Sequence, residues 1–548
     1  DFTIVLGSPI FNDEQVNRQK TAEAFSNDFS SRTALELIDG EFVVINFNKI
    51  NGTLKIINDR FTAVPLYYYH HPETKIFCAT PYFSNIWSFL SKIGQLKIKN
   101  EAFFEFLWFQ RLFGIKTLAR NALFMPDAHI LEYDGRRISL SRYWQRNYGK
   151  NKNSLSFNAR YLADCVRYSI SMKTADNPKT GHFLSGGMDS RSVLAGFTDN
   201  LPTCFTVGIS ENREVRTARQ IAETKGAKHV YLPLHNEHYG MIREKAVPLC
   251  GGMYNYDHAI FLGYQNEIKK YANVCFNGYG FDFMFQGMYI PGTNLKIRNH
   301  VLFLRRMSTL PDDLVSYFIS NASYRIKGAD IWNYIKKDKT ENLKEFIFDS
   351  IGEIHRKGCE LTDDKNDLWE YFTFHHISRH YSYPNVMAIA TFAEPRIISF
   401  TNDIFDFYLS LPAKQRFNGR IEKKMLKTLD PKLANIKSAN TDLPVVANSF
   451  EQTILQLAKA AKRRINSEKD YEEWTQRTWP SRDYAIRNQN TLKTSLNNIL
   501  NSDILNNLDF LEIGKIKNDL PDWMNNKNTA LSGDFLQTIL TIGTFLQK

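Results

Sequence analysis

The sequence predicts a two-part α/β protein, with a β-rich N-terminal domain and a parallel α/β domain whose last part is helical. Apolar and polar residues alternate in the first 70 residues, which is the period of half-buried strands. Between residues 180 and 280, short apolar runs alternate with helix-like stretches, as in a parallel sheet. After His300 the sequence is mostly of helical type.

Strands of the N-terminal domain are predicted at residues 34–47, 54–61 and 64–68, where apolar residues alternate. Asn51 and Gly52 lie between the first two of these segments and form the usual two-residue turn of a hairpin. The N-terminal third is therefore expected to be rich in β-structure.

The domain boundary is predicted just after Trp144, where residues 145–154 are polar, rich in asparagine and contain a glycine. Such a composition is typical of a loop between domains. We therefore assign residues 1–148 to the first domain and residues 155–548 to the second.

A phosphate-binding turn is predicted at residues 185–187, where a short apolar run ends in Ser-Gly-Gly and a helix-like segment follows. Glycines have no Cβ, so backbone N–H groups can approach a phosphate closely, and the helix N-terminus adds partial positive charge. Asp189 would repel a phosphate directly. We therefore expect it to hold a Mg²⁺ ion that bridges phosphate oxygens of ATP.

A second glycine turn is predicted after another buried strand. Residues 203–208 and 272–276 are strand candidates, a third apolar run begins at His229, and residues 277–282 then end on the carboxylate of Asp282. Ligands of parallel α/β sheets bind at the carboxyl ends of strands, so Asp282 is expected to be a second metal ligand. The candidate nucleotide contacts are Leu184, Ser185, Gly186, Gly187, Asp189, Ser190, Val207 and Gly278.

The turn Ser-Gly-Gly-X-Asp-Ser resembles the signature of the PP-loop ATP pyrophosphatases, which cleave ATP to AMP and pyrophosphate. No Walker A motif occurs in the chain. Together the two turns resemble the asparagine synthetase family, whose second turn reads Ser-Gly-Glu-Gly-x-Asp-Glu. Gly278, Gly280 and Asp282 are kept, whereas Tyr279 and Phe283 replace the two glutamates. The resemblance implies ATP and Mg²⁺ binding, with an acceptor chemistry that differs from asparagine synthesis.

Later motifs extend this resemblance. Residues 394–396 match the family's Glu-x-Arg, residues 419–427 match Gly-x-x-Glu-Lys-x-x-Leu-Arg, and residues 398–401 depart from the family's Pro-Phe-Leu-Asp. Lys437 falls where the family has a lysine that contacts pyrophosphate, and a cation there would stabilise charge that develops in the transition state. The resemblance gives as candidate catalytic residues Lys437, Tyr279, Arg396 and Lys423.

The N-terminal part resembles the family's glutamine amidotransferase domain, an Ntn-type sandwich. Residues 59–68 are similar to Asp-Arg-x-Gly-x-x-Pro-Leu-Tyr-Tyr, with Thr62 in place of the glycine. That domain uses an N-terminal cysteine, whereas this sequence starts at Asp1 and its first cysteine is Cys78. Glutamine hydrolysis is therefore not expected, unless the true start of the chain is missing. Residues 5–9 and 142–144 look like the lasso peptide cyclases, which resemble β-lactam synthetase in lacking this nucleophile.

The resemblance implies a ligase that adenylates a carboxylate, releases pyrophosphate and joins the acid to an amine, as in lasso peptide macrocyclisation. The expected cofactors are ATP and Mg²⁺, and the substrate is a peptide or small molecule. Whether the ligase works with a companion biosynthetic protein is left open by the sequence. The alternatives are transfer of free ammonia to a small acid or sugar, a tRNA-modifying PP-loop enzyme, and a nucleotide-binding pseudoenzyme that acts as a scaffold.

Composition limits the partners. The net charge is +11, but the one dense basic run, residues 459–464, lies beside helically spaced apolar residues, which favours the wet face of an amphipathic helix over a nucleic-acid site. No apolar run is long enough to span a bilayer, and the opening residues lack a signal-peptide pattern. The six cysteines lack metal-ligand spacing, so we expect reduced thiols and a cytoplasmic location.

Three further patterns predict structure more than chemistry. His376 and His380 are one helical turn apart and are expected on a helix that supports the acceptor pocket, without metal. The aromatic residues at 103–109 are expected in the core, and residues 534–546 predict a buried closing helix.

Overall fold

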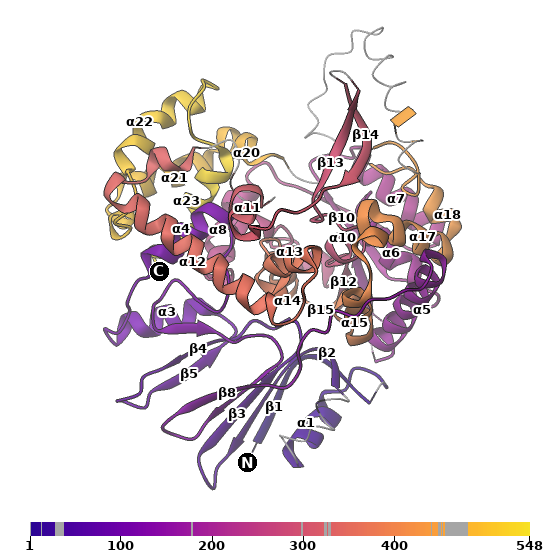
Figure 1. Cartoon of the computed structure of the whole chain (residues 1–548), viewed down its shortest axis with the longest axis horizontal. Coiled ribbons are helices and arrows are strands. Elements are labelled where there is room, and N and C mark those ends of the chain that lie inside the picture. Colours follow the sequence, from indigo (N-terminus) through magenta and orange to yellow (C-terminus); the bar gives the residue numbers. More distant parts are fainter. Residues whose placement is uncertain are drawn as a thin grey trace.

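The computed structural model describes residues 2–12, 14–27, 35, 38–176, 179–297, 300–322, 326, 330–439, 441–447, 451, 453–454 and 480–548. The fold is mixed α/β, with antiparallel sheets at the N-terminal end, a five-stranded parallel sheet in the middle and helices toward the C-terminus (Figure 1). The basic run at residues 459–464 lies outside the described residues.

Two antiparallel sheets pack face to face in the N-terminal part. The larger has the order β1-β2-β3-β7-β8 and the smaller β5-β4-β6. Val43, Ile56 and Leu131 of the larger sheet and Tyr68 of the smaller share one buried cluster. The strands are β1 (Phe2–Phe11), β2 (Ile38–Asn48), β3 (Thr53–Asn58), β4 (Tyr67–His70), β5 (Phe77–Thr80), β6 (Ala122–Phe124), β7 (His129–Tyr133) and β8 (Ile138–Arg142).

Helices cover the outer faces of this pair of sheets. Helix α1 (Arg18–Asn27) buries Phe25 against the larger sheet. Helices α3 (Phe83–Lys92) and α4 (Asn100–Phe109) bury aromatic side chains with Tyr67 of the smaller sheet, which confirms the core assignment of residues 103–109. The strand predicted at residues 64–68 begins only at Tyr67, because Pro65 has no N–H to contribute to a ladder.

The parallel sheet has the strand order β11-β10-β9-β12-β15. The chain moves outward from β9 to β11 and then returns to the other side of β9 as β12. The order therefore reverses between β9 and β12, and the loops after these two strands diverge to leave a crevice, the usual ligand site of such sheets. The strands are β9 (Thr180–Phe183), β10 (Thr203–Gly208), β11 (His229–Pro233), β12 (Val274–Asn277) and β15 (Glu394–Ile397).

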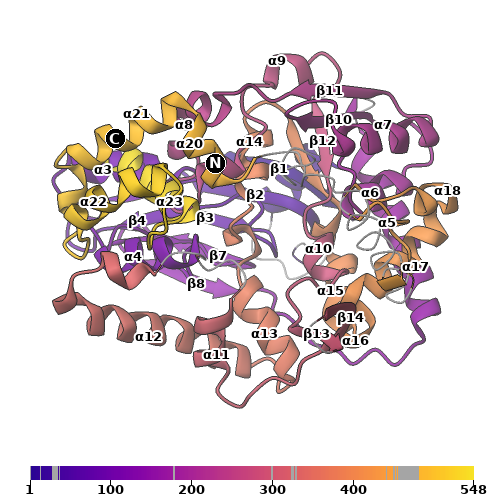
Figure 2. The same ribbon diagram turned by 90° about the horizontal axis from the view of Figure 1, so that it is seen from above.

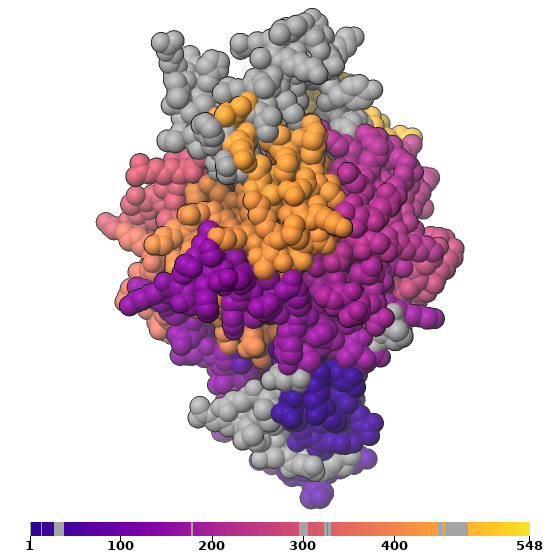
Figure 3. All heavy atoms as spheres, turned by 90° about the vertical axis from the view of Figure 1, so that its right-hand side faces the viewer, coloured from indigo at the N-terminus to yellow at the C-terminus, as the bar shows by residue number. Residues whose placement is uncertain are grey.

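Helices surround this sheet and form the C-terminal region. Helices α6, α17 and α18 lie near one another beside β10 and β12 (Figure 2), and α5 and α17 pack together on one face, in purple and orange in Figure 3. The helices are α5 (Leu155–Thr174), α6 (Asp189–Gly196), α7 (Arg213–Lys225), α8 (His238–Leu249), α9 (Gln265–Ile268), α10 (Phe281–Met284), α11 (Leu314–Asn321), α12 (Thr340–Cys359), α13 (Lys365–Phe374), α14 (Pro384–Ala390), α15 (Asn402–Ser410), α16 (Ala413–Arg416), α17 (Arg420–Leu429), α18 (Pro431–Asn435), α20 (Arg482–Asn488), α21 (Asn490–Asn501), α22 (Ile513–Met524) and α23 (Gly533–Leu546).

The region after residue 290 contains one structure that the sequence did not predict. Strands β13 (Gly292–Ile297) and β14 (His300–Met307) form an antiparallel ribbon that projects from the body of the molecule (Figure 1). The predicted closing helix is confirmed, because α23 is buried and its Phe545 packs against Trp87 of α3 at a centroid distance of 4.9 Å. No described helix is both long and apolar enough to cross a membrane.

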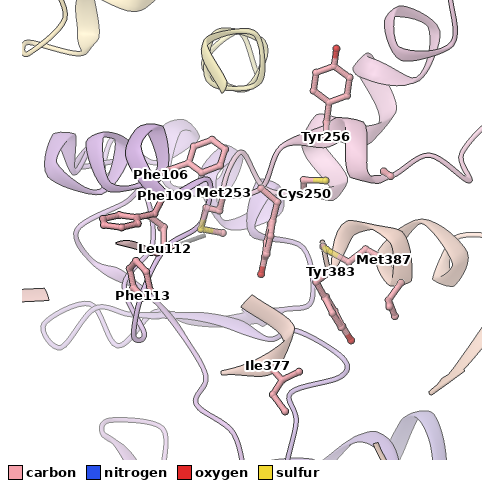
Figure 4. Close-up of a cluster of buried hydrophobic side chains, with 14 of the residues drawn as sticks. Phe106, Phe109, Leu112, Phe113, Cys250, Met253, Tyr256, Ile377, Tyr383 and Met387 are labelled. Atoms are coloured by element: carbon pink, nitrogen blue, oxygen red, sulfur yellow. The ribbon is translucent and has the colours of Figure 1, made fainter. Parts of the chain in front are cut away.

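The apolar core continues across the predicted domain boundary. Phe106, Phe109 and Phe113 of the N-terminal part belong to the same buried cluster as Met253 and Tyr383 of the α/β part (Figure 4). A buried ion pair of 2.7 Å between Glu41 of β2 and Lys173 of α5 joins the same two parts. The division at residues 148 and 155 stays a prediction, and the two parts share one core.

Candidate active site

The turn after β9 is closed by its own serines. The N–H of Ser185 donates to Oγ of Ser190 at 3.0 Å, and the two hydroxyl oxygens are 2.9 Å apart. The N–H of Gly187 donates to Oγ of Ser185 at 3.2 Å. The turn is thus held in shape by the polar groups that we expect to meet phosphate.

The carboxylate of Glu214 accepts a hydrogen bond from the backbone of the other glycine of this turn, Gly186. The side chain lies in the first turn of α7, and its Oε1 accepts the N–H of Gly186 at 2.7 Å. A phosphate that bound the N–H of Gly186 would have to displace the carboxylate of Glu214 from it. The sequence did not single out Glu214 for this contact, because it comes from the helix after the next strand.

The two glycine turns touch each other at the switch point of the sheet. A Cβ on Gly278 would lie 2.6 Å from the backbone nitrogen of Ser190 and 2.9 Å from Cβ of Asp189. Only glycine allows this approach, since such short contacts would force one of the two turns to move. The structure therefore places the turn after β12 directly beside the turn after β9, as the sequence predicted for strands of one parallel sheet.

Three carboxylates at the turns are close enough to interact: Asp189 and Asp282 are half-buried, and Glu422 is buried. Burial raises the pKa of Asp189 to about 6, and burial together with the negative charge of Asp189 raises the pKa of Asp282 to about 7. The third is Glu422 of α17, whose pKa is raised well above the usual value by burial and by Asp189. The amide of Gln286 donates to Oδ1 of Asp189.

These carboxylates suit a divalent cation. Their ligand atoms are all oxygen, which is the set that Mg²⁺ prefers, and Oε2 of Glu422 is buried with no hydrogen-bond partner among the described residues. Across the described part of the chain, no three acidic, His or Cys side chains are already drawn together at ligand distances. Asp189 and Asp282 would hold the ion only after their side chains closed on it.

Arg191 connects the turn to the segment that carries Lys437. The guanidinium is buried and donates to the carbonyl oxygens of Gly186 at 3.1 Å, Ile436 at 2.6 Å and Lys437 at 3.2 Å. The N–H of Ala439 also donates to the carbonyl of Gly186, at 3.2 Å. The backbone at Lys437 is therefore fixed against the turn.

The side chain of Lys437 is 65% exposed, and its ammonium lies 3.5 Å from Oδ1 of Asp442. It reaches no group of the turn in this structure. The side chain can turn toward a phosphate at the turn, because its four-carbon stem is flexible and its backbone is anchored nearby.

Lys423 and Arg396 occupy different surroundings. The ammonium of Lys423 donates to the carbonyl of Ala447 at 3.2 Å, and burial lowers its pKa. The guanidinium of Arg396 is fully used by Asp176, at 2.8 Å, and by Glu394, at 2.6 Å. These partners are outside both glycine turns, so the structure does not bring Arg396 into the phosphate site.

Tyr279 lies in an aromatic wall next to Asp282. Its hydroxyl donates to the carbonyl of Ile377 at 3.2 Å, and its ring packs against Phe283 and Tyr383 at centroid distances of 5.7 and 5.4 Å. Burial raises the pKa of the phenol well above its usual value. The group is therefore a neutral hydrogen-bond donor here and is poorly suited to act as a base.

Leu184 and Val207 lie at the carboxyl ends of β9 and β10. Both side chains are buried, in two separate apolar clusters, and the N–H of Leu184 donates to the carbonyl of Phe205 at 2.8 Å. They place the turn on the rim of the sheet.

The expectation that the two histidines lie on one helix is wrong. Helix α13 ends at Phe374, and His376 and His380 flank a short 3₁₀ turn instead of lying on one helix. Nδ1 of His376 is 2.6 Å from Asp127 of the N-terminal part, whereas Nε2 of His380 is 2.9 Å from the hydroxyl of Tyr289. At the end of this helix, Arg146 donates to the carbonyl of His375 at 2.9 Å, one of the carbonyls that a helix end leaves free.

Part of the chain matches a known protein family. Residues 161–430 match the asparagine synthase family. The matched segment contains both glycine turns, the three carboxylates and Lys423, and it ends before Lys437. This segment of the chain is therefore similar to an asparagine synthase domain.

The chain is also similar in sequence to an asparagine synthetase, at low identity. The glutamine-hydrolysing asparagine synthetase 1 of Bacillus subtilis (strain 168) is 24% identical over 318 residues, which cover 53% of this chain and 48% of that protein. The chain thus spans about half the length of this relative. The asparagine synthase family uses ATP, which agrees with a nucleotide site at the two turns.

Proposed function

We propose that the chain is an ATP-dependent ligase that forms an amide by way of an acyl-adenylate. An oxygen of the substrate carboxylate attacks the α-phosphorus, the bond to the bridging oxygen breaks, and pyrophosphate leaves with that electron pair. An amine then attacks the acyl carbon, AMP leaves, and the amine loses its proton. The observation that carries the proposal is the contact between the two glycine turns, which sets Asp189 beside Asp282 at the switch point of the sheet.

The residues of the chain supply position and charge. Ser185, Ser190 and the N–H groups of the turn would bind the leaving pyrophosphate, and Arg191 holds the turn against the segment of Lys437. Asp189 and Asp282 would hold Mg²⁺, which neutralises phosphate oxygens when bound. Preorganised groups of this kind lower the barrier because they need not reorganise as charge develops.

We further propose that the amine belongs to the substrate, as in lasso peptide macrocyclisation. A cavity of about 700 Å³ lies between the N-terminal sheets and the α/β part, and Tyr383 and Met387 belong to its lining. Tyr383 donates to the carbonyl of Ala63 and packs on Tyr279. A cavity of this size has room for a substrate that carries its own amine, which favours such an amine over free ammonia.

Mass spectrometry tests this proposal. The chain is incubated with ATP, Mg²⁺ and peptides that carry both a free amine and a side-chain carboxylate. We expect a product lighter than its peptide by one water, together with equal amounts of AMP and pyrophosphate. The Asp189→Asn variant is the control and should form neither. Amide formation that instead required added ammonia would favour the small-acid alternative.

A further inference from the structure

Glu422 is a buried carboxylate whose placement needs an explanation. It lies in the first turn of α17, on the face that also buries Ile421, Met425 and Leu426, and it is fully inaccessible. Its Oε1 accepts the hydroxyl of Ser192 at 2.9 Å, whereas Oε2 has no hydrogen-bond partner in the described part of the molecule. An unpaired buried carboxylate oxygen is costly, so a missing partner is expected at Oε2.

Other buried glutamates of this chain show what such a group normally faces. Three of them each meet a positive side chain at short distance, which is the usual condition for burying a carboxylate. These pairs are Glu41 with Lys173 at 2.7 Å, Glu105 with Lys116 at 2.8 Å and Glu370 with Arg416 at 2.6 Å.

Glu422 faces negative groups instead. Asp189 and Asp282 are both close enough to interact with Glu422 electrostatically. Two ionised carboxylates offer each other only acceptors. The adjacent ammonium of Lys423 donates to the carbonyl of Ala447 and leaves Oε2 without a donor. A cation between the three carboxylates would supply the positive charge and the partner for Oε2 that the described residues do not provide.

We propose that Glu422 is a third carboxylate ligand of the divalent-cation site formed with Asp189 and Asp282. The inference rests on the proposed function, because that function assigns the cation to the two aspartates. Ser192 orients Glu422 through Oε1, as Gln286 orients Asp189, and such outer contacts fix the direction of ligand atoms. Mutual repulsion explains why the three groups are not already closed around a point.

The test measures Mn²⁺ binding to the nucleotide-free protein, from the paramagnetic resonance signal of the free ion. We expect Glu422→Gln to weaken binding on the order of tenfold or more, as for other groups that fix a metal site. The matched control is Glu223→Gln, which removes the same charge from the exposed face of α7 and should leave the affinity unchanged. Ser192→Ala should weaken binding less than Glu422→Gln.

Two controls make each outcome decisive. Without metal, Glu422→Gln should melt at or above the temperature of the wild type, because it removes a repulsive buried charge; Mn²⁺ should then raise its melting temperature less. If Asp189→Asn loses Mn²⁺ and Glu422→Gln keeps wild-type affinity, the inference is wrong and the proposed function stands. If Asp189→Asn keeps wild-type affinity, the cation assignment of the proposed function itself is wrong.

Discussion

At the residue scale, the site contains a few carboxylates in positions where burial disfavours their charged form. Burial raises the pKa of Asp189, and burial together with the negative charge of Asp189 raises the pKa of Asp282. Shifted pKa values of this kind are common at sites that bind a cation or a substrate. The backbone of Lys437 is held by Arg191, whereas its side chain is exposed to solvent beside Asp442. Binding and turnover should therefore respond differently to these residues.

Replacing either aspartate should abolish adenylation without unfolding the protein. We expect Asp189→Asn and Asp282→Asn each to remove ATP-dependent pyrophosphate release, because the cation loses a charged ligand. The melting temperature should change little, since each change removes a buried charge without removing volume. Pyrophosphate release is measured beside thermal unfolding. Wild-type release in either variant would show that the metal assignment is wrong.

Lys437→Ala should reduce turnover more than it weakens ATP binding. A fixed cation gains value as negative charge develops on the leaving pyrophosphate, so we expect a loss on the order of a hundredfold in turnover. Steady-state rates and ATP binding by calorimetry separate the two effects. Lys423→Ala is the comparison and should lose less, because its ammonium is held by Ala447. Weakened ATP binding with normal turnover would make Lys437 a ground-state anchor.

At the element scale, the turn after β9 depends on how closely its neighbours approach. The segment after α18 lies against Gly186, and the turn after β12 lies against Ser190. These contacts join three elements that are far apart in the sequence. Strands and turns of this region were predictable because their signals are local: apolar runs, glycines and the acidic residue after each turn. The contributions of Glu214, Gln286 and Arg191 were not, because they depend on how helices pack.

Gly186→Ala should disturb the turn through one identified contact. The new Cβ would lie 2.4 Å from Cβ of Ala439, which must move together with the segment of Lys437. We expect a loss of turnover on the order of a hundredfold, as for a displacement of about 1 Å at a reacting group. The double variant Gly186→Ala/Ala439→Gly should recover most of it. Equal loss in both variants would mean that the steric contact is not the cause.

The sequence analysis missed the β13–β14 ribbon and the end of α13 for different reasons. The ribbon is a local pairing of two consecutive strands whose pattern was taken as helical. At the end of α13, by contrast, the distant Arg146 donates to the carbonyl of His375. The spacing of His376 and His380 matched a helix, but tertiary contacts overrode that preference. Glu422 was recognised as part of a motif, and only its position among the carboxylates indicated a role.

At the scale of the whole molecule, the N-terminal sheets and the α/β part share a core, a buried ion pair and further polar contacts. Glu41 accepts from Lys173 and from the N–H of Ile397, and Asp127 meets His376. The N-terminal part therefore supports the strand β15 and the aromatic wall near Tyr279. These contacts tie the N-terminal part to the α/β part through Ile397 and His376.

Lys173→Met should destabilise the protein by about 3 kcal/mol, because it leaves the carboxylate of Glu41 buried without its cation. The double variant Lys173→Met/Glu41→Gln should regain much of this, since the uncompensated charge is gone. Urea unfolding measures both and gives the coupling between the residues. A change below about 0.5 kcal/mol in the single variant would show that the pair does not hold the two parts together.

The central claim is that ATP is cleaved between its α- and β-phosphates at the two glycine turns. The most direct measurement identifies the nucleotide products by phosphorus NMR, with wild-type protein and Asp189→Asn, in the presence of Mg²⁺ and a mixture of peptides with free amines and carboxylates. We predict AMP and pyrophosphate in equal amounts from the wild type and neither from the variant. ADP and phosphate as products, or cleavage that persists in Asp189→Asn, would contradict the account.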